Sequence, residues 1–559
     1  VTEINKNKGY YGTNIKQNFG SGLAFSWTFT EGGTLTISGS GEMPDISEEY
    51  DEDTGESIFE WPWDEWKNGV RAVVIENGIT GIGAHAFYQH ANLERASIPD
   101  TVTSIGSYAF AETKLRGDLT ISDHVTSLGT GAFNQCSQLT SVTMGTGLTA
   151  IPDEAFFWCE GLEDLTIGEN VTTIGEDAFY QCHCLTHVDI PDHVTTIKRY
   201  AFEYSNGLRS VSIGAGVSSI AANSFLGCEA LESFTVDEKN STYAAVDGVL
   251  YNKDLTSLIT CPCGMSGNYT IPAGVTDIQN GAFANCSKLT SITISAGVSS
   301  VDPSAFNGCE SVAAYQVEEG NPTYSAVDGI LFSKDQKTLI RCPVGKTGDF
   351  TVPTGVTTIE DNAFSGCKGL TSVTILDSVT AIGEHAFEWC SSLTTAEIGA
   401  GVTEIPSYCF SSCSNLKSVT FGPSVTHICS YAFSWTGLTD IYYGGTAAQW
   451  GEIGIDQWNY DLPNVEIHTS DNVEIPSASG TCGDDLTWSL SRSGVLTIRG
   501  TGDMYDVAVI TDEDIYVESP WDTYKVRSVV IESGVTGQQH IEKMLNKSLR
   551  NLGMDYIDL

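Results

Sequence analysis

Positive charge is scarce in this chain: 27 lysines and arginines stand against 71 aspartates and glutamates, a formal net charge of −44. Such a surface repels nucleic acid and anionic membranes, so neither is expected as a partner. Apolar runs of 18 or more residues are missing, and the sequence therefore predicts no transmembrane helix. GxGxxG and P-loop patterns are also absent. Solubility accounts for the acidic balance, with a cation-dependent role as the alternative.

What the chain does contain is a phenylalanine that recurs every 23 residues, with two insertions that lengthen the spacing to 58 residues. A fixed period of this length predicts a stack of near-identical coils, each buried against its neighbours, in place of one globular core. We call these residues the repeat phenylalanines; they are Phe87, Phe110, Phe133, Phe156, Phe179, Phe202, Phe225, Phe283, Phe306, Phe364, Phe387, Phe410 and Phe433.

Each coil carries one pattern around its repeat phenylalanine. A Leu-x-x-Val-x-Ile segment ends with a period of two and predicts a short strand, and Val-Thr-x-Ile predicts a second extended piece. Gly-x-x-Ala-Phe is too short for a stable helix and is interpreted as a single helical turn. The fold class expected is an α/β repeat solenoid with short helical turns, small β caps and a parallel sheet of about fifteen strands.

The pattern also predicts where the parts of the chain begin and end. The two insertions, near 240–268 and 321–349, match each other in sequence and are expected to form β-hairpins that project from the stack. The chain opens at Val1 without a signal-peptide core, so we expect a processed piece of a longer product. The predicted segments are an N-terminal extension at 1–21, a β cap at 22–70, the solenoid at 71–437, a C-terminal cap at 438–468, a linker at 469–480, a second copy of the β cap at 481–537 and an unrelated tail at 538–559.

Nine of the sixteen cysteines stand three residues after a repeat phenylalanine, where the other coils place histidine, threonine or serine. A position that accepts all four residue types needs a small or polar group beside the backbone, so we expect buried free thiols rather than disulfides. Cys182-His183-Cys184 and Cys261-Pro262-Cys263 suggest a metal, but no second pair stands at zinc-site spacing. The acidic loop 48–53 lacks the pattern of an EF-hand and is interpreted as solvated. No metal site is predicted.

The repeat pattern, A-F-x-x-C-x-x-L-x-x-V-x-I-x-x-x-V-T-x-I, resembles the BspA-like leucine-rich repeat family of bacterial surface and secreted proteins. Residues 139–156 and 370–390 carry it well, and the resemblance covers about residues 70–440. It implies a right-handed leucine-rich-repeat superhelix with a concave parallel sheet, displayed outside the cell. It brings neither catalytic residues nor a cofactor. The last 22 residues separately resemble a fragment of an aldo-keto reductase, as a fusion or frameshift product or as a genuine tail.

A binding surface is predicted where aromatic residues follow the repeat phenylalanines and charged residues follow on the strands. We expect an extracellular or cell-surface protein that binds a protein or glycoprotein, without catalysis. The alternatives are a structural stalk and the non-catalytic part of a multidomain enzyme. The candidate binding residues are the aromatic Phe157, Trp158, Tyr180 and Tyr204 and the charged Glu163, Asp164, Asp189 and Arg209.

Overall fold

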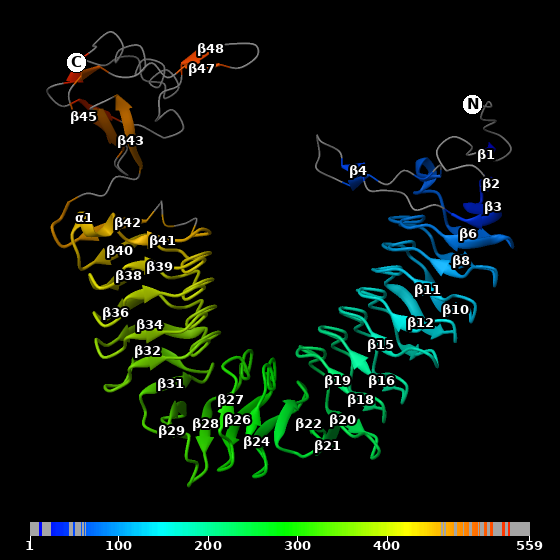
Figure 1. Cartoon of the computed structure of the whole chain (residues 1–559), viewed down its shortest axis with the longest axis horizontal. Coiled ribbons are helices and arrows are strands. Elements are labelled where there is room, and N and C mark those ends of the chain that lie inside the picture. Colours follow the sequence, from blue (N-terminus) through cyan, green and yellow to red (C-terminus); the bar gives the residue numbers. More distant parts are fainter. Residues whose placement is uncertain are drawn as a thin grey trace. The chain divides into compact units, whose positions relative to one another are not determined.

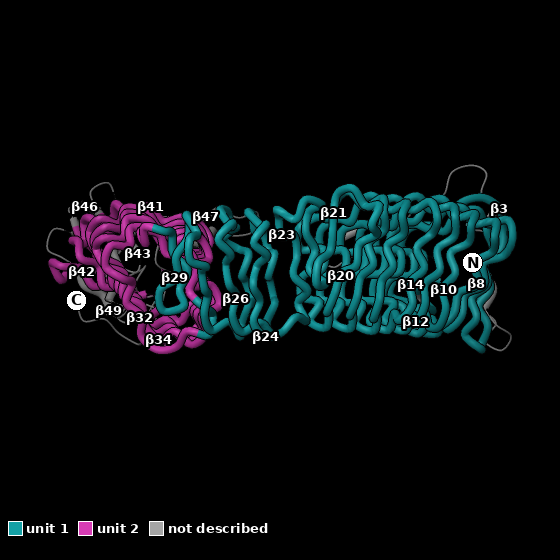
Figure 2. The backbone as a smooth tube through the Cα atoms, turned by 90° about the horizontal axis from the view of Figure 1, so that it is seen from below, with its two compact units in different colours: residues 1–334, 343–345 teal, residues 335–342, 346–559 magenta. Residues whose placement is uncertain are grey.

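The computed structural model describes residues 24–43, 61, 63–459, 462 and 465–473, with strands at 10–13, 49–50 and 57–58 and a set of separate strands between 478 and 536. The tail at 538–559, which resembles an aldo-keto reductase fragment, lies outside the described residues, as does most of the acidic loop 48–53. The chain divides into two compact units (Figure 2): residues 1–334 with 343–345, and residues 335–342 with 346–559.

Both units are β-solenoids in which every coil contributes one long strand (Figure 1). Strands stand at all fifteen positions that the repeat predicts, and two further coils follow at β40 and β42. The long strands of the first unit are β6 (Ala72–Ile75), β8 (Arg95–Ser97), β10 (Arg116–Ile121), β12 (Gln138–Met144), β14 (Asp164–Thr166), β16 (His187–Ile190), β18 (Ser210–Ile213), β20 (Ser233–Val236), β24 (Gly267–Thr270), β26 (Leu289–Ile294) and β28 (Ala314–Val317). Those of the second are β32 (Thr347–Thr351), β34 (Gly369–Ile375), β36 (Thr395–Ile398), β38 (Ser418–Phe421), β40 (Asp440–Tyr443) and β42 (Glu466–Thr469).

The long strands pair in parallel, but the expectation of one continuous sheet of about fifteen strands is wrong. In the first unit the sheets are β6–β8, β10–β12–β14, β16–β18–β20 and β24–β26–β28. Two of the breaks follow β8 and β14, which are only three residues long, and the third falls at the first insertion. In the second unit β32 to β42 form one parallel sheet of six strands.

A second row of short strands comes from the Val-Thr-x-Ile segments, as predicted. Most of their isoleucines and leucines are buried and face the core from the side opposite the long strands' apolar residues, whereas Ile455 of the last short strand is exposed. In the first unit this row is β7 (Ile79–Ile82), β9 (Ser104–Ile105), β11 (Ser127–Leu128), β13 (Ala150–Ile151), β15 (Thr173–Ile174), β17 (Thr196–Ile197), β19 (Ser219–Ile220), β23 (Ser257–Thr260), β25 (Asp277–Ile278) and β27 (Ser300–Val301). In the second it is β31 (Thr338–Arg341), β33 (Thr358–Ile359), β35 (Ala381–Ile382), β37 (Glu404–Ile405), β39 (His427–Ile428) and β41 (Gly454–Ile455).

The single helical turn expected at each repeat phenylalanine does not form, and the α/β class is therefore wrong. Residues two before and two after the phenylalanine, such as His85 and Gln89 around Phe87, have φ near +57° and +56°. An α-helix needs a run of negative φ, so this alternation excludes one. It instead lets His85, Phe87 and Gln89 donate their N–H groups to carbonyls of the next coil at 2.8–3.0 Å. Within the described residues the helices are α1 (Ala447–Trp450) and the one-turn 3₁₀ helix η1 (Asp64–Trp66). The right-handed sense of the solenoid stays a prediction.

The repeat phenylalanines stack on one another as predicted. In the first unit the rings from Phe87 to Phe225 form an unbroken column with centroids 5.0–5.6 Å apart, and Phe283 stacks on Phe306 at 5.5 Å. In the second unit the rings from Phe364 to Phe433 stack at 4.8–5.6 Å. Within a column, each buried phenylalanine ring packs against the rings of the coils next to it. These columns are therefore the main apolar contact between coils.

The cysteines after the repeat phenylalanines are buried free thiols. Seven of the nine donate an S–H···O hydrogen bond to the carbonyl of the repeat phenylalanine one coil earlier, at 3.1–3.4 Å; for example, Cys159 donates to Phe133. Ser205 donates from its hydroxyl to Phe179 in the same way. Most coils therefore place a short side chain with a donor at this position, which explains why serine can replace cysteine there. Thr113 and Thr436 donate to the phenylalanine carbonyl of their own coil, and the first coil has His90.

The insertions form antiparallel hairpins, as predicted, but the first does not project. Its β21 (Tyr243–Val246) and β22 (Val249–Asn252) continue into β23, which pairs in parallel with β25 of the next coil. Leu250 and Tyr251 of β22 are buried in the core. The second insertion opens with the matching hairpin of β29 (Tyr324–Val327) and β30 (Ile330–Ser333). The insertions thus add core to the solenoid instead of a free arm.

A buried asparagine fastens the start of each insertion. Asn240 donates two hydrogen bonds, to the carbonyls of Gly214 and Val217, and its side-chain oxygen accepts from the N–H groups of Thr242 and Tyr243, all at 2.8–2.9 Å. Asn321 makes the same four bonds in the second insertion. An asparagine that satisfies all its hydrogen-bonding groups in the core ties the insertion to the preceding coil.

The two copies of the cap module have the same strand pairing. In the first copy β1 (Tyr10–Thr13), β2 (Ala24–Phe29) and β3 (Thr34–Glu42) form an antiparallel meander, and β3 pairs in parallel with β6 and β7. In the second copy β43 (Ala478–Gly483), β44 (Leu486–Leu490) and β45 (Val495–Gly500) do the same, and β45 pairs in parallel with β49 (Ser528–Ile531). The remaining strands are β4 (Glu49–Tyr50), β5 (Ser57–Ile58), β46 (Gly502–Asp503), β47 (Ala508–Ile510), β48 (Ile515–Val517) and β50 (Val535–Thr536).

Trp63 closes the first end of the phenylalanine column, and its loss should destabilise the first unit. Its ring stacks on Phe87 at 5.9 Å, its indole N–H donates to the carbonyl of Ala86 at 2.8 Å, and it is buried. Replacing it with alanine leaves the end of the column open, which should cost about 3–5 kcal/mol of unfolding free energy. Calorimetric or urea unfolding would measure this. Trp435→Ala, at a 66% exposed tryptophan, is the matched control and should change little; equal effects of the two substitutions would contradict the prediction.

Thiol reactivity should divide the cysteines into two classes. Cys184 is exposed and Cys429 is half-buried, while the other cysteines of the described residues are buried. Burial raises the pKa of the Cys136 thiol to about 12, and a thiol that is neither ionised nor accessible does not react. In native, non-reducing buffer a thiol reagent should modify the exposed Cys184 rapidly and Cys429 more slowly, because burial and the nearby Glu404 raise the pKa of the Cys429 thiol to about 12. The other cysteines of the described residues should react only after denaturation. Few reactive thiols after denaturation would show that disulfides had been missed.

Candidate protein-binding surface

The four predicted aromatic residues form one continuous strip on the edge of the first unit. Phe157 stacks on Trp158 at 5.8 Å within its own coil and on Tyr180 of the next coil at 4.6 Å, and Tyr180 meets Tyr204 of the following coil edge-on at 5.9 Å. Trp158 and Tyr204 are exposed, at 39% and 37%, while Phe157 and Tyr180 are half-buried between them. We call these four residues the aromatic strip.

The local backbone turns the strip outward. Trp158 and Tyr204 occupy the position two after a repeat phenylalanine, where φ is +56° and +54°. In the next coil Gly227 stands at the same position, and a Cβ there would lie 2.3 Å from the Tyr204 ring. The absence of a side chain at Gly227 therefore gives the Tyr204 ring the space it occupies over that coil.

The four predicted charged residues are all exposed, but they lie on the long-strand side, and two of them form ion pairs there. Arg209 reaches Glu232 of the next coil at 3.3 Å, and Asp189 pairs with His187 at 2.9 Å. The hydrogen bond from His187 lowers the pKa of Asp189. Asp164 begins β14, the strand that follows the Trp158 turn, and Glu163 directly precedes it. The structure thus joins the aromatic residues into one surface and leaves the charged residues as a neighbouring polar area.

Two carboxyl groups beside the strip are partly held in the neutral form. Burial raises the pKa of Glu203 to about 7, and the negative charge of Asp177 adds to the rise. Burial likewise raises the pKa of Asp177 to about 6, with further contributions from Glu176, Glu154 and Asp153. Glu203 lies next to Tyr204 in the chain and Asp177 three residues before Tyr180, so the strip has a negative potential that grows as pH rises.

The second unit carries another aromatic row, which the sequence pattern did not reveal. The rings of His385, Tyr408, Tyr431 and Trp458 stack in order at 4.7, 4.7 and 5.8 Å. Trp389, Trp435 and Trp458 are exposed, at 57%, 66% and 45%. Sequence reasoning singled out aromatics just after the repeat phenylalanine, whereas Tyr408 and Tyr431 stand two residues before one. A search of that position in every coil would have found them.

A hollow of about 570 Å³ lies at the long-strand side of the second unit, lined by Phe421, Tyr442 and His468 among others. Tyr442 stacks on His468 at 4.5 Å, and His468 pairs with Asp440 at 2.8 Å. The sequence did not indicate it, because its lining comes from residues up to 95 apart in the chain, Asp377 to Asn472.

The two motifs that suggested a metal are not among the groups whose donor atoms lie close enough together, within the described residues, to hold an ion. Cys182 is buried and donates to Phe156, while Cys184 is exposed. Cys261 and Cys263 are buried against the coil of Phe283, where Cys263 donates to Ala284 at 3.4 Å. Among the described residues, the groups close enough to hold a metal are instead His427, Cys429 and Asp456, and Asp440, Glu466 and His468.

Comparison with protein families gives one match, the "BspA type Leucine rich repeat region (6 copies)", at residues 65–183, 149–266, 260–325 and 344–453. Comparison with curated protein sequences gives no match. Within the described residues, no helix has the length and apolar character needed to cross a membrane.

Several solved structures are similar to this chain. A leucine-rich cell surface protein from Faecalibacterium prausnitzii is 24% identical, with 80% of this chain and 98% of that chain covered and a TM-score of 0.34. A leucine-rich repeat protein from Bacteroides ovatus is 20% identical, with 84% and 99% covered and a TM-score of 0.36. The pneumococcal vaccine antigen PcpA is 16% identical, with 84% and 99% covered and a TM-score of 0.32.

The raised carboxyl pKa values predict that stability falls as pH rises. For Glu203 and Asp177 the folded pKa lies above the ordinary values of 4.5 and 3.8, so folding binds protons. Their stabilising contribution is complete below about pH 4 and is lost as pH passes about 6 and about 7. We expect a higher melting temperature at pH 5 than at pH 8.

Variants separate this effect from general charge repulsion. Glu203→Gln should melt above the unmodified chain at pH 8 and close to it at pH 4.5. Glu160→Gln, at an exposed carboxylate two coils earlier, is the control and should leave the pH profile in place. A Glu203→Gln profile parallel to that of the unmodified chain would show that Glu203 is ionised throughout.

Proposed function

Because this chain belongs to the BspA-type leucine-rich repeat family, we propose that it acts outside the cell, secreted or on the cell surface, as an adhesion protein that binds a protein or glycoprotein. The family match covers most of the solenoid. Stacked repeats of this kind present an extended surface that suits binding, and the match names no catalytic residues. The proposed activity is binding alone, without a cofactor.

The observation that carries the proposal is the aromatic strip. Large exposed rings on soluble proteins are costly unless a partner covers them, and tryptophan and tyrosine are enriched among the residues that dominate binding energy. Here two exposed rings, Trp158 and Tyr204, are held in place by two half-buried ones, Phe157 and Tyr180. Rings already fixed by packing lose little conformational entropy when a partner binds.

The polar surroundings suit a partner with basic groups. Glu163, Asp164 and Asp189 lie exposed on the neighbouring strands, Glu203 and Asp177 lie beside the rings, and the whole chain has a net charge of −44. Arg209 is the one cation among the candidate residues, and it is paired with Glu232. Complementary charge would mainly raise the association rate and make it sensitive to salt.

Two alternatives remain testable beside this proposal. A structural stalk would separate other domains from the cell surface and would bind nothing through the solenoid. A non-catalytic part of a multidomain enzyme would bind that enzyme's substrate. Pull-down with the purified chain from extracellular-matrix and mucin extracts separates a binder from a stalk, and turnover with NADPH would reveal a reductase.

Replacing the rings should weaken binding of a glycoprotein recovered in such a pull-down. Trp158→Ala and Tyr180→Ala should each cost more than about 1 kcal/mol, which is about a fivefold rise in Kd. Trp158 contributes exposed contact area, whereas Tyr180 supports Phe157 and Tyr204. Surface plasmon resonance with the immobilised glycoprotein would measure the change.

Trp435→Ala is the matched control, because it removes an exposed ring from the equivalent position of a coil in the second unit. Unchanged Kd in the control and raised Kd in the two strip variants would support the site. If only Trp435→Ala weakens binding, the site lies in the second unit; if none does, with circular dichroism unchanged, the aromatic strip is not the binding surface.

A further inference from the structure

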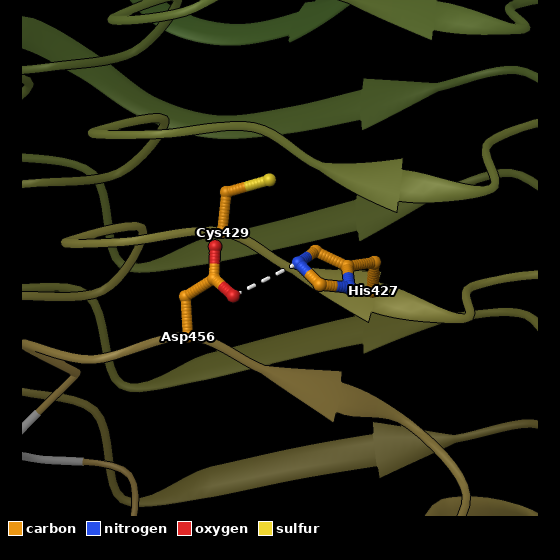
Figure 3. Close-up of side chains that lie close together, drawn as sticks. All are labelled: His427, Cys429 and Asp456. Carbon is orange, nitrogen blue, oxygen red and sulfur yellow. Dashed lines mark hydrogen bonds and ion pairs between the residues drawn. The ribbon is translucent and has the colours of Figure 1, made fainter.

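Three side chains of different chemistry converge at the short-strand row of the second unit. His427 lies on β39, Cys429 follows that strand, and Asp456 follows β41 of the next coil. Figure 3 shows the imidazole, thiol and carboxylate gathered in one place. One donor atom from each lies within 4.8 Å of the other two, and His427 Nε2 is 3.1 Å from the Asp456 carboxylate. The group is distinct from the aromatic strip, which lies in the first unit.

The register of the repeat produces this convergence. His427 pairs directly with Gly454 of the next coil, and residues two apart along a strand point to the same side. Cys429 therefore lies on the same side as His427, and Asp456 on the same side as position 454. A Cβ at Gly454 would lie 2.6 Å from His427 Nδ1, so only glycine leaves room for the imidazole. The pairing of β39 with β41 therefore provides both the space for the His427 ring and the donor groups around it.

The residues here depart from what the repeat places elsewhere. Six residues before the repeat phenylalanine, ten of the thirteen coils have glycine, alanine, serine or threonine, whereas the last two have Glu404 and His427. Four residues before it, Cys429 is the only cysteine among the thirteen coils. Small residues suffice to build the coil at these positions, so folding of the repeat does not require three donor groups there.

We propose that His427, Cys429 and Asp456 bind a Zn²⁺ ion. Imidazole nitrogen, thiolate sulfur and carboxylate oxygen are the ligands that zinc prefers, and the sulfur disfavours Ca²⁺ and Mg²⁺. Tetrahedral zinc with bonds of about 2.0–2.3 Å places its donors about 3.3–3.8 Å apart. Small side-chain shifts from the present spacing achieve this.

The charge also balances. Binding displaces the thiol proton of Cys429 to solvent, after which a thiolate, a carboxylate and a neutral imidazole together carry two negative charges against the two positive charges of zinc. Glu404 of the preceding coil accepts a hydrogen bond from Cys429 at 3.3 Å, so its carboxylate is near enough to take the fourth position or to hold a water there. Zinc would then join three successive coils, those of β37, β39 and β41, and stabilise that end of the solenoid.

The test uses the tag-free full chain after removal of metal with EDTA. Isothermal titration with Zn²⁺ should give one tight site with a Kd of micromolar or below, and Co²⁺ should produce a thiolate-to-metal charge-transfer band. Zinc should also raise the melting temperature, because it binds the folded state only. Cys429→Ser and Asp456→Asn should each raise the Kd at least tenfold, and Cys429→Ser should abolish the charge-transfer band.

Two controls identify the site. Cys184→Ser removes the one exposed cysteine among the described residues, and His468→Ala breaks the second group of Asp440, Glu466 and His468, which has no sulfur. Both should leave the affinity for Zn²⁺ and the Co²⁺ band unchanged. The proposal is overturned if the chain binds no zinc, if Cys429→Ser and Asp456→Asn bind as tightly as the unmodified chain, or if His468→Ala alone removes binding. Circular dichroism of each variant confirms the fold, and Asp456→Asn, which keeps shape and size, is decisive if Cys429→Ser unfolds.

Discussion

Everything in this structure depends on the contact between one coil and the next at a step of 23 residues. The repeat phenylalanines stack at 4.8–5.6 Å within unbroken columns, and the same step aligns backbone donors with acceptors on the long strands, on the short strands and at the turn around each phenylalanine. A coil alone cannot bury its apolar side or satisfy its backbone, so each is stable only against its neighbours. The stack of phenylalanine rings is consequently interrupted only where other residues replace the missing contact. Trp63 does so at the first end, and the hairpin strands do so at the first insertion.

The turn at the repeat phenylalanine illustrates how backbone geometry arranges function on this fold. Alternating left-handed residues direct N–H groups along the stack, and the same alternation directs the side chains two positions either side of the phenylalanine outward. Those positions carry Trp158 and Tyr204 in the first unit and Tyr408, Tyr431 and Trp435 in the second. Because every coil repeats this backbone geometry, aromatic residues at these positions in neighbouring coils contact one another and form a row of rings.

Variation within a repeat separates structural positions from the rest. Where most coils have the same residue type, the reason is visible in the core: phenylalanine for the column, and cysteine or serine for the hydrogen bond to the carbonyl one coil earlier. Where a coil departs from the small residue that most coils have, as at His427, or has a residue type that no other coil has at that position, as at Cys429, the fold does not supply a reason. Such departures are the positions from which binding or metal chemistry on a solenoid is best sought.

The sequence by itself determined the solenoid, the number of predicted strand positions, the stacking of the phenylalanines and the burial of the thiols, because a 23-residue period leaves each of these features one consistent arrangement. The conformation of the turn around each repeat phenylalanine could not be predicted, because a five-residue segment is too short to show a period. In addition, its residues with positive φ, such as His85 and Gln89, are not glycines, which usually indicate that conformation. The sequence also failed for the breaks between sheets, where three-residue strands such as β8 and β14 end the pairing. Only the tertiary structure decided which side chains meet across coils. Tyr431 with Trp458, and His427 with Asp456, are 27 and 29 residues apart, because the last coils do not keep the step of 23, and no period in the sequence predicts those contacts.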